Sequence, residues 1–186
     1  MKRNTFLLCL LLLCMQVANA QLTKGNWLVG GNGYLSSQSQ NLRGVNVKGS
    51  NLRLSPNVGY FIADKFAAGA RINFEINKLR YPGVVDNSTR YGIGPFLRYY
   101  LLNSEKRVNI LTEAFYQYSK TTSDNSSSSD NTFRISAGPV IYFNSSVGLE
   151  FTLNYEYLKM PETDTDTKKF FLGIGFQIHL ESNKNY

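Results

Sequence analysis

Charged side chains at alternate positions offer the most chemistry in this chain. Most are flanked on both sides by apolar residues, as Arg53 is by Leu52 and Leu54. Successive side chains point to opposite faces of a β-strand, so this spacing puts the charges on one face and the apolar residues on the other. Such a set could line a conduction path or neutralise itself in a buried network. The set comprises four arginines and four glutamates: Arg53, Arg71, Glu75, Arg98, Glu113, Arg134, Glu150 and Glu156.

The sequence context argues against a catalytic or a phosphate-binding site. His179 is the single histidine, and a nucleophilic mechanism would need it as a base beside a serine. It shares the parity of Gln177, and neither residue two positions away is a serine, so we predict no catalytic residue. Gly92-Ile93-Gly94 and Gly173-Ile174-Gly175 lie inside alternating stretches with no helix after them, which argues against a phosphate loop. We therefore predict no bound cofactor.

Metal ligands are also weakly represented. Both cysteines, Cys9 and Cys14, lie in an N-terminal stretch that we expect to be removed, so neither disulfides nor thiolate metal sites are predicted. Carboxylate oxygens could hold a divalent cation between loops, but we interpret the loop aspartates as solvated tips and predict no metal site. These aspartates are Asp124, Asp130, Asp164 and Asp166.

The elements that position the charges are long strands. The stretch 52–76 contains two alternating runs folded back through Ala63-Asp64-Lys65, which predicts a β-hairpin. Each arm is roughly twice the five or six residues usual in soluble domains, and is about as long as a tilted strand that crosses a bilayer. The same alternation predicts eight strands, over residues 26–38, 51–62, 68–77, 89–102, 107–119, 132–143, 147–158 and 168–180.

The predicted connections alternate between long and short. Polar stretches at 38–48, 80–88, 120–131 and 159–167 are expected as long loops, and 63–65, 103–106 and 144–146 as tight turns. Outer-membrane barrels have short periplasmic turns and long external loops. The pattern therefore predicts a transmembrane barrel with both termini on the periplasmic side.

A short repeat supports this arrangement. It reads Ser55-Pro56-Asn57-Val58-Gly59-Tyr60-Phe61, then Gly94-Pro95-Phe96-Leu97-Arg98-Tyr99-Tyr100, then Gly138-Pro139-Val140-Ile141-Tyr142-Phe143. Each copy ends in an aromatic pair just before a predicted short turn. We expect these pairs to form an aromatic girdle at the inner membrane–water interface.

The first 20 residues are predicted to be a cleaved signal peptide. Lys2 and Arg3 precede an apolar run from Phe6 to Met15, and Ala18-Asn19-Ala20 supplies a small-x-small cleavage site. The predicted mature chain is 21–186. Its basic excess is modest and scattered, since the whole chain has 20 basic and 13 acidic residues. This argues against nucleic-acid binding and fits attraction to anionic lipid headgroups.

With these strands and repeats, the chain resembles the outer-membrane β-barrel domain family, the small eight-stranded barrels similar to the OmpA transmembrane domain, OmpX and OmpW. The resemblance covers nearly all of residues 21–186 and rests on pattern more than on invariant motifs. It implies an integral protein of the bacterial outer membrane. It also implies contacts with outer-membrane lipid and lipopolysaccharide, and insertion by the barrel assembly machinery.

The predicted fold is therefore all-β: an eight-stranded antiparallel up-and-down transmembrane β-barrel. An eight-stranded barrel is about wide enough for its own side chains. We therefore interpret the charges, with the inward Phe61, Phe96, Tyr100, Phe115 and Tyr142, as a plug. The predicted function is a non-enzymatic membrane anchor or interaction module that displays external loops, whose partner the sequence does not identify. The alternative is a small pore or hydrophobic-ligand channel of the OmpW kind, and an enzyme acting on lipid A is a third hypothesis.

Overall fold

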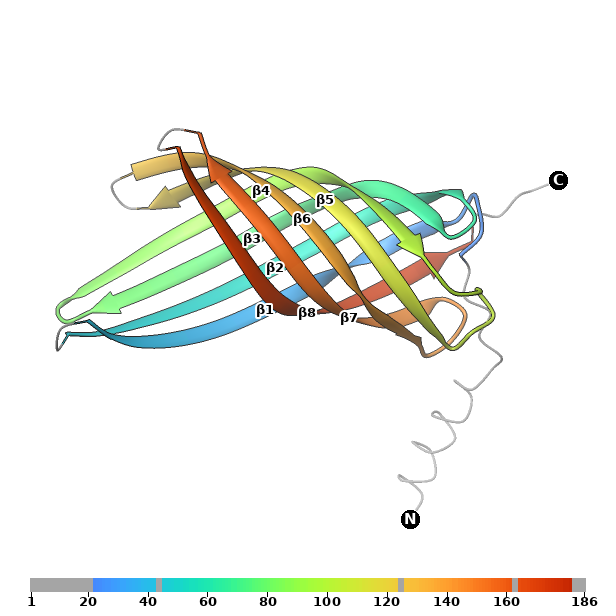
Figure 1. The fold of residues 1–186 in the computed structure, drawn as a ribbon, viewed down its shortest axis with the longest axis horizontal. Helices are drawn as coiled ribbons and strands as arrows, with labels where there is room; N and C mark the ends of the chain where they lie inside the picture. The colour runs from blue at the N-terminus through green and yellow to red at the C-terminus, as the bar shows by residue number, and fades with distance from the viewer. Residues whose placement is uncertain (1–21, 43–44, 124–125, 162–163, 182–186) are drawn as a thin grey trace, which may run out of the picture.

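Eight antiparallel strands close into one barrel, as the computed structural model shows (Figure 1). The structure describes residues 22–42, 45–123, 126–161 and 164–181. Each strand pairs with the next in sequence, and β8 pairs back onto β1, which confirms the predicted fold class. The strands are β1 (Trp27–Leu42), β2 (Val45–Ala63), β3 (Phe66–Tyr81), β4 (Val84–Tyr100), β5 (Val108–Ser123), β6 (Ser126–Tyr142), β7 (Val147–Met160) and β8 (Thr165–Leu180).

The alternating apolar and polar residues of the sequence occupy the outer and inner faces of the barrel wall. In β4 the apolar Ile93 and Leu97 are 59% and 50% exposed on the outside, whereas Phe96 and Arg98 are buried inside. A closed sheet leaves no strand edge within the closed section and satisfies backbone groups between strands, as a membrane interior requires. Among the described residues, no helix has the length and apolar character needed to span a membrane.

The predicted long loops are wrong, because strands occupy most of these stretches. β1 runs to Leu42 and β2 begins at Val45, and β5 runs to Ser123 and β6 begins at Ser126. Polar residues can form strands here because the paired strands keep their backbone ladder, to which the β5–β6 hairpin adds side-chain bonds. One such bond joins the Ser123 and Ser126 hydroxyl oxygens at 2.9 Å. The longest interval between strands, 101–107, lies instead at the other end of the barrel.

An apolar band with aromatic and basic margins surrounds the barrel. The outward-facing apolar positions of β5 end at Tyr118 and are followed by Lys120, and those of β8 end at Phe170 and are followed by Lys168. Lys78 and Lys159 follow the band on β3 and β7. Aromatic and lysine side chains both favour the membrane–water boundary, because an apolar body can stay in lipid while the polar end reaches water. We call Lys78, Lys120, Lys159 and Lys168 the lysine collar.

The repeated aromatic pairs divide between the two faces of the wall. Tyr60, Tyr99 and Phe143 face outward, and Trp27 packs edge-on to Tyr60 at 5.3 Å between ring centroids. The other member of each pair is buried inside the barrel: Phe61, Tyr100 and Tyr142. Consecutive strand residues must face opposite sides, so only half of the predicted girdle can contact lipid.

The prolines of the repeat interrupt the strand pairing. Paired positions between β2 and β3 skip from Leu54 to Asn57, past Pro56, and the same gap recurs at Pro95 in β4 and Pro139 in β6. Proline has no N–H to donate to the ladder, so each repeat loosens one contact between neighbouring strands.

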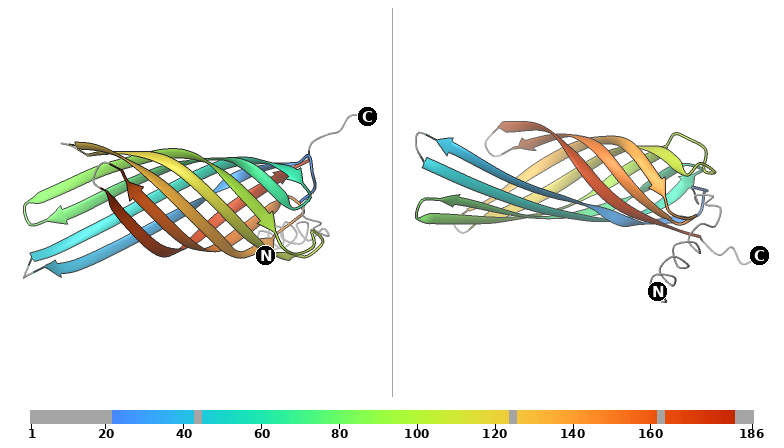
Figure 2. Two further views of the ribbon diagram at one scale, coloured as in Figure 1. Left: turned by 45° about the horizontal axis from the view of Figure 1, so that its top comes forward. Right: turned by 90° about the horizontal axis from the view of Figure 1, so that it is seen from below.

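The seam between β1 and β8 is closed only in part. Pairing runs from Trp27 opposite Leu180 to Gly33 opposite Ile174, and there it stops. Beyond that point β1 continues beside β2, and β8 continues beside β7. Figures 1 and 2 show the two strands diverging toward their outer ends. We call the unpaired section, from Tyr34 on β1 and Gly173 on β8 outward, the open seam.

Candidate functional site

The inner half of the barrel holds a neutral chain of four charged residues. Arg71 donates two hydrogen bonds to Glu113, at 2.5 and 2.9 Å. Arg98 donates to the same carboxylate at 2.7 and 3.0 Å and to Glu150 at 2.7 Å. All four residues are at most 4% exposed. Buried charges survive only when paired and hydrogen-bonded, and this set balances two positive against two negative charges.

A second ion-pair chain fills the next level outward. Glu156 accepts from Arg134 at 2.6 Å and from Arg53 at 3.1 Å. Arg53 also contacts Glu75 at 2.8 Å, and Arg90 links Glu75 to a further carboxylate. That carboxylate is Asp130, which Arg90 contacts at 2.5 Å, and Lys169 contacts Glu156 at 3.2 Å. Four cations therefore meet three anions, which leaves one positive charge in excess.

Aromatic rings separate and support the guanidinium groups. Arg71 and Arg134 lie 5.0 and 5.2 Å from the centroid of the Phe115 ring, so Phe115 joins the two chains of ion pairs. Arg53 and Arg134 also lie within 5.6 Å of the Phe171 centroid. Cations are attracted to aromatic faces, most strongly where water is excluded. The layers of charge are therefore bound to rings as well as to carboxylates.

The end of the barrel where β1 begins and β8 ends is filled by rings around His179. Its imidazole lies 5.5 Å from the Phe61 ring, 5.8 Å from Tyr100 and 5.7 Å from Tyr142 between centroids. Leu22 is 1% exposed and belongs to the same cluster. We call these five residues the base plug, and His179 has a packing position there rather than a solvent-facing one.

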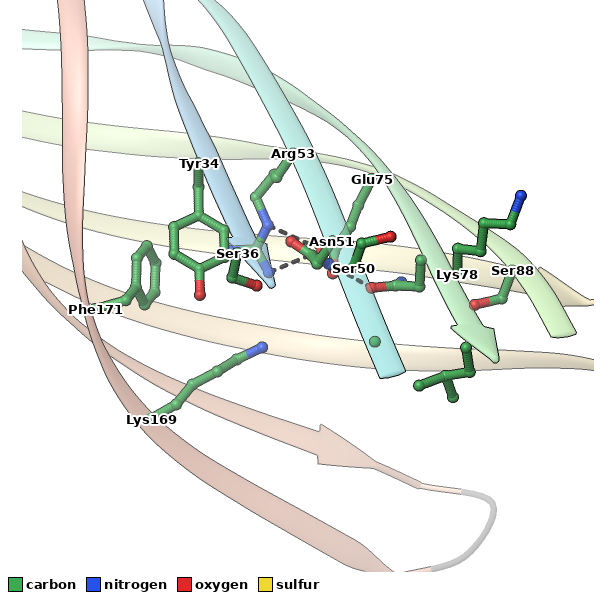
Figure 3. Close-up of a pocket in the computed structure, with 13 residues that line it drawn as sticks. Tyr34, Ser36, Ser50, Asn51, Arg53, Glu75, Lys78, Ser88, Lys169 and Phe171 are labelled. Carbon is green, nitrogen blue, oxygen red and sulfur yellow. Dashed lines mark hydrogen bonds and ion pairs between the residues drawn. The ribbon is translucent and has the colours of Figure 1, made fainter. Parts of the chain in front are cut away.

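A cavity of about 390 Å³ opens at the outer end. Its floor is the pair Arg53 and Glu75, and Tyr34 and Phe171 line one side with ring centroids 5.1 Å apart (Figure 3). Lys169 reaches toward the space from β8. Its charged lining residues are three cations, Arg53, Lys78 and Lys169, and one anion, Glu75. Its polar floor and basic walls suit an anionic group.

All eight residues predicted from the sequence lie in the barrel interior, and ion pairs connect them in two groups. Three members of the network were not predicted. Arg90 has the inward parity of Arg98, so alternation alone would have included it. Lys169 has the inward parity of His179. Asp130 was assigned to a solvated loop, which is wrong: it is 3% exposed and bound to Arg90.

The remaining candidates occupy ordinary structural positions. Asp164 and Asp166 are exposed, and Asp124 lies outside the described residues. Within the described ranges, no group of three His, Cys, Asp or Glu residues could hold a metal ion. Gly92 lies inside β4, where an added Cβ would come within 2.3 Å of the Gln117 amide nitrogen. The inward glycine thus makes room for a packed side chain.

An apolar outer band, a closed antiparallel barrel and an ion-paired interior together define an integral outer-membrane barrel. The family model for the outer membrane protein beta-barrel domain matches residues 5–185, and the chain belongs to this family. It is an integral protein of the bacterial outer membrane.

Solved structures share the fold at low sequence identity. Neisserial surface protein A is 17% identical with a TM-score of 0.53, and the match covers 83% of this chain and 97% of that one. The outer membrane protein OprG from Pseudomonas aeruginosa is 11% identical with a TM-score of 0.55, covering 89% of this chain and all of that one (100%). No curated protein sequence matches this chain.

Proposed function

We propose that this protein is a non-conducting, non-enzymatic barrel that anchors strand hairpins at the cell surface. The observation that supports the proposal is that successive layers of side chains fill the lumen. The base plug fills one end, and two levels of ion pairs with Phe96 and Phe115 fill the middle. The outer cavity stops at Arg53 and Glu75. At this strand number the lumen holds little beyond its own side chains.

The part presented to the outside is a set of hairpins rather than irregular loops. β4 continues seven residues past Tyr91, where its unbroken series of outward apolar residues stops, to Val84. At 3.3 Å per residue this is roughly 20 Å of strand beyond the band. Tyr81, Val84 and Val85 are 43–59% exposed at the tip of this hairpin. A rigid paired hairpin presents such side chains at lower entropic cost than a flexible loop.

The proposal includes two sets of partners. Anionic outer-membrane lipid, including lipopolysaccharide, would contact the lysine collar through its phosphates, which lysine binds as a point charge. The barrel assembly machinery would act during insertion. The side chains at the hairpin tips do not identify a partner.

Planar-bilayer recording tests the closure. The purified barrel should pass no steady current, and Tyr142→Ala should also stay silent because the Arg98–Glu150 layer still closes the lumen above it. Leu153→Ala, on the lipid face, is the matched control. Large, stable, ion-selective channels from the unmodified protein would overturn the proposal and favour a pore.

A further inference from the structure

The open seam combines exposed apolar side chains, unpaired strand edges and access to a basic cavity. Pairing stops at Gly33 and Ile174, but apolar outward residues continue past it on both strands. Leu35, Phe170 and Leu172 are 77%, 71% and 75% exposed, more than any other large apolar side chain among the described residues. The seam therefore opens within the outer part of the apolar band, where it meets lipid.

The glycines at the start of the seam show how far the strands have separated. An added Cβ at Gly30, in the paired section, would lie 2.2 Å from the Phe176 carbonyl oxygen of β8. At Gly175, which is paired with Asn32, an added Cβ would also meet β1, at 3.4 Å from the Gly31 carbonyl oxygen, whereas at Gly173 the atoms within 4 Å all belong to β7. Strand edges opened in a membrane expose backbone N–H and C=O groups, which hydrocarbon cannot satisfy.

The inner side of the seam leads to the outer cavity. Tyr34 and Phe171 stand on its two edges, one on β1 and one on β8, and their rings meet edge-on inside. Lys169 lies two residues before Phe171 on β8, so both side chains have the same parity, and Lys169 lines the same cavity with a side chain 41% exposed. Lys169 shares Glu156 with Arg53 and Arg134, so three cations meet this one carboxylate.

We propose that the open seam binds one anionic lipid of the surrounding membrane. Its acyl chain lies against Leu35, Phe170 and Leu172, and its phosphate enters the cavity beside Lys169. The acyl chain covers the apolar side chains that no strand covers, and the headgroup oxygens accept hydrogen bonds that the open edges and the lysine can donate. A soluble anion could contact Lys169 but would leave Leu35, Phe170 and Leu172 uncovered.

Native mass spectrometry of the detergent-solubilised barrel, titrated with phosphatidylglycerol or phosphatidylcholine, tests the headgroup. We expect one phosphatidylglycerol to bind with clear preference over phosphatidylcholine. Lys169→Gln should weaken it about tenfold, as the loss of one charge-assisted contact does. Lys106→Gln, in the exposed interval 101–107 at the other end of the barrel, is the matched control and should change little. Equal binding of the two lipids, or equal effects of the two variants, would overturn the proposal.

A second measurement tests the acyl-chain part and the seam itself. Leu172→Ser should weaken phosphatidylglycerol binding, and excess inorganic phosphate should not displace the lipid. If phosphate competes fully, the site recognises a free anion and the proposal is overturned. When membranes that contain the double variant Val29→Cys with Ile178→Cys are treated with a thiol oxidant, a disulfide should form, because these two residues are paired. Leu35→Cys with Leu172→Cys should not, and efficient crosslinking there would show a closed seam.

Discussion

Removing one buried ion pair should be far less damaging than removing half of it. The pair to remove is Arg98 and Glu150, through Arg98→Met and Glu150→Leu. Arg98 donates to Glu150 at 2.7 Å, and among the described residues the other side-chain hydrogen bond to this carboxylate comes from the Gln177 amide at 3.5 Å. Deleting both residues leaves Arg71 with its two hydrogen bonds to Glu113, which is a complete neutral pair.

The expected magnitudes follow from what each variant leaves behind. Arg98→Met isolates the Glu150 carboxylate and should cost about 3–5 kcal/mol of unfolding free energy. Glu150→Leu leaves Arg98 sharing Glu113 with Arg71, and should fall near the lower end of the same range. The double variant replaces a buried pair by apolar side chains and should cost less than about 2 kcal/mol. The coupling energy between the two sites should then be at least about 4 kcal/mol.

Urea unfolding of the barrel in lipid vesicles measures these differences. Trp27 is the single tryptophan and is 48% exposed on the lipid-facing side, so its fluorescence reports the loss of the barrel. Linear extrapolation then gives the unfolding free energy of each variant. The control is Lys159→Met, which breaks a 3.5 Å pair with Asp164 between exposed side chains. It should cost less than about 1 kcal/mol.

A different double variant separates pairing from simple loss of side-chain volume. Arg98→Met with Glu113→Leu removes two residues that touch, yet it leaves Arg71 and Glu150 without their partners. Within the described residues, the ion pairs of Arg71 and Glu150 go to Glu113 and Arg98 alone. This double variant should be at least as unstable as either single one. If both doubles simply add the costs of their singles, charge pairing does not hold the interior together.

Two further variants test the wall of the barrel. Leu153→Arg, 55% exposed on the lipid face, should cost about 2–4 kcal/mol, whereas Thr89→Arg at the outer margin should cost about 0–1 kcal/mol, measured by the same unfolding assay. Equal costs at the two depths would contradict the assigned membrane position. Gly94→Ala puts a Cβ 1.8 Å from the Tyr116 carbonyl oxygen and should cost about 2–3 kcal/mol, because the β5 backbone must move. Gly33→Ala meets nothing closer than 3.8 Å, and a loss of stability equal to that of Gly94→Ala would refute the steric argument.

The sequence alone determined which residues face inward and that the strands form a membrane barrel. Alternation has a period of two wherever one face of a strand meets lipid and the other meets the lumen, so parity assigned Arg98 and Glu113 to the interior without any knowledge of their partners. The same rule would have included Arg90. It failed at Asp130, because a run of serines around this residue has the composition of a loop although it forms a paired hairpin.

Only the tertiary structure decided which charges meet and where the wall is open. Arg53 and Glu156 are 103 positions apart in sequence, and they meet because barrel closure brings β2 and β7 across the same lumen. The end of the β1–β8 pairing at Gly33 is equally invisible in the sequence, since residues on both strands go on alternating past it. Parity is a local property of each strand, whereas ion pairing and the extent of closure depend on the register between strands far apart in the chain.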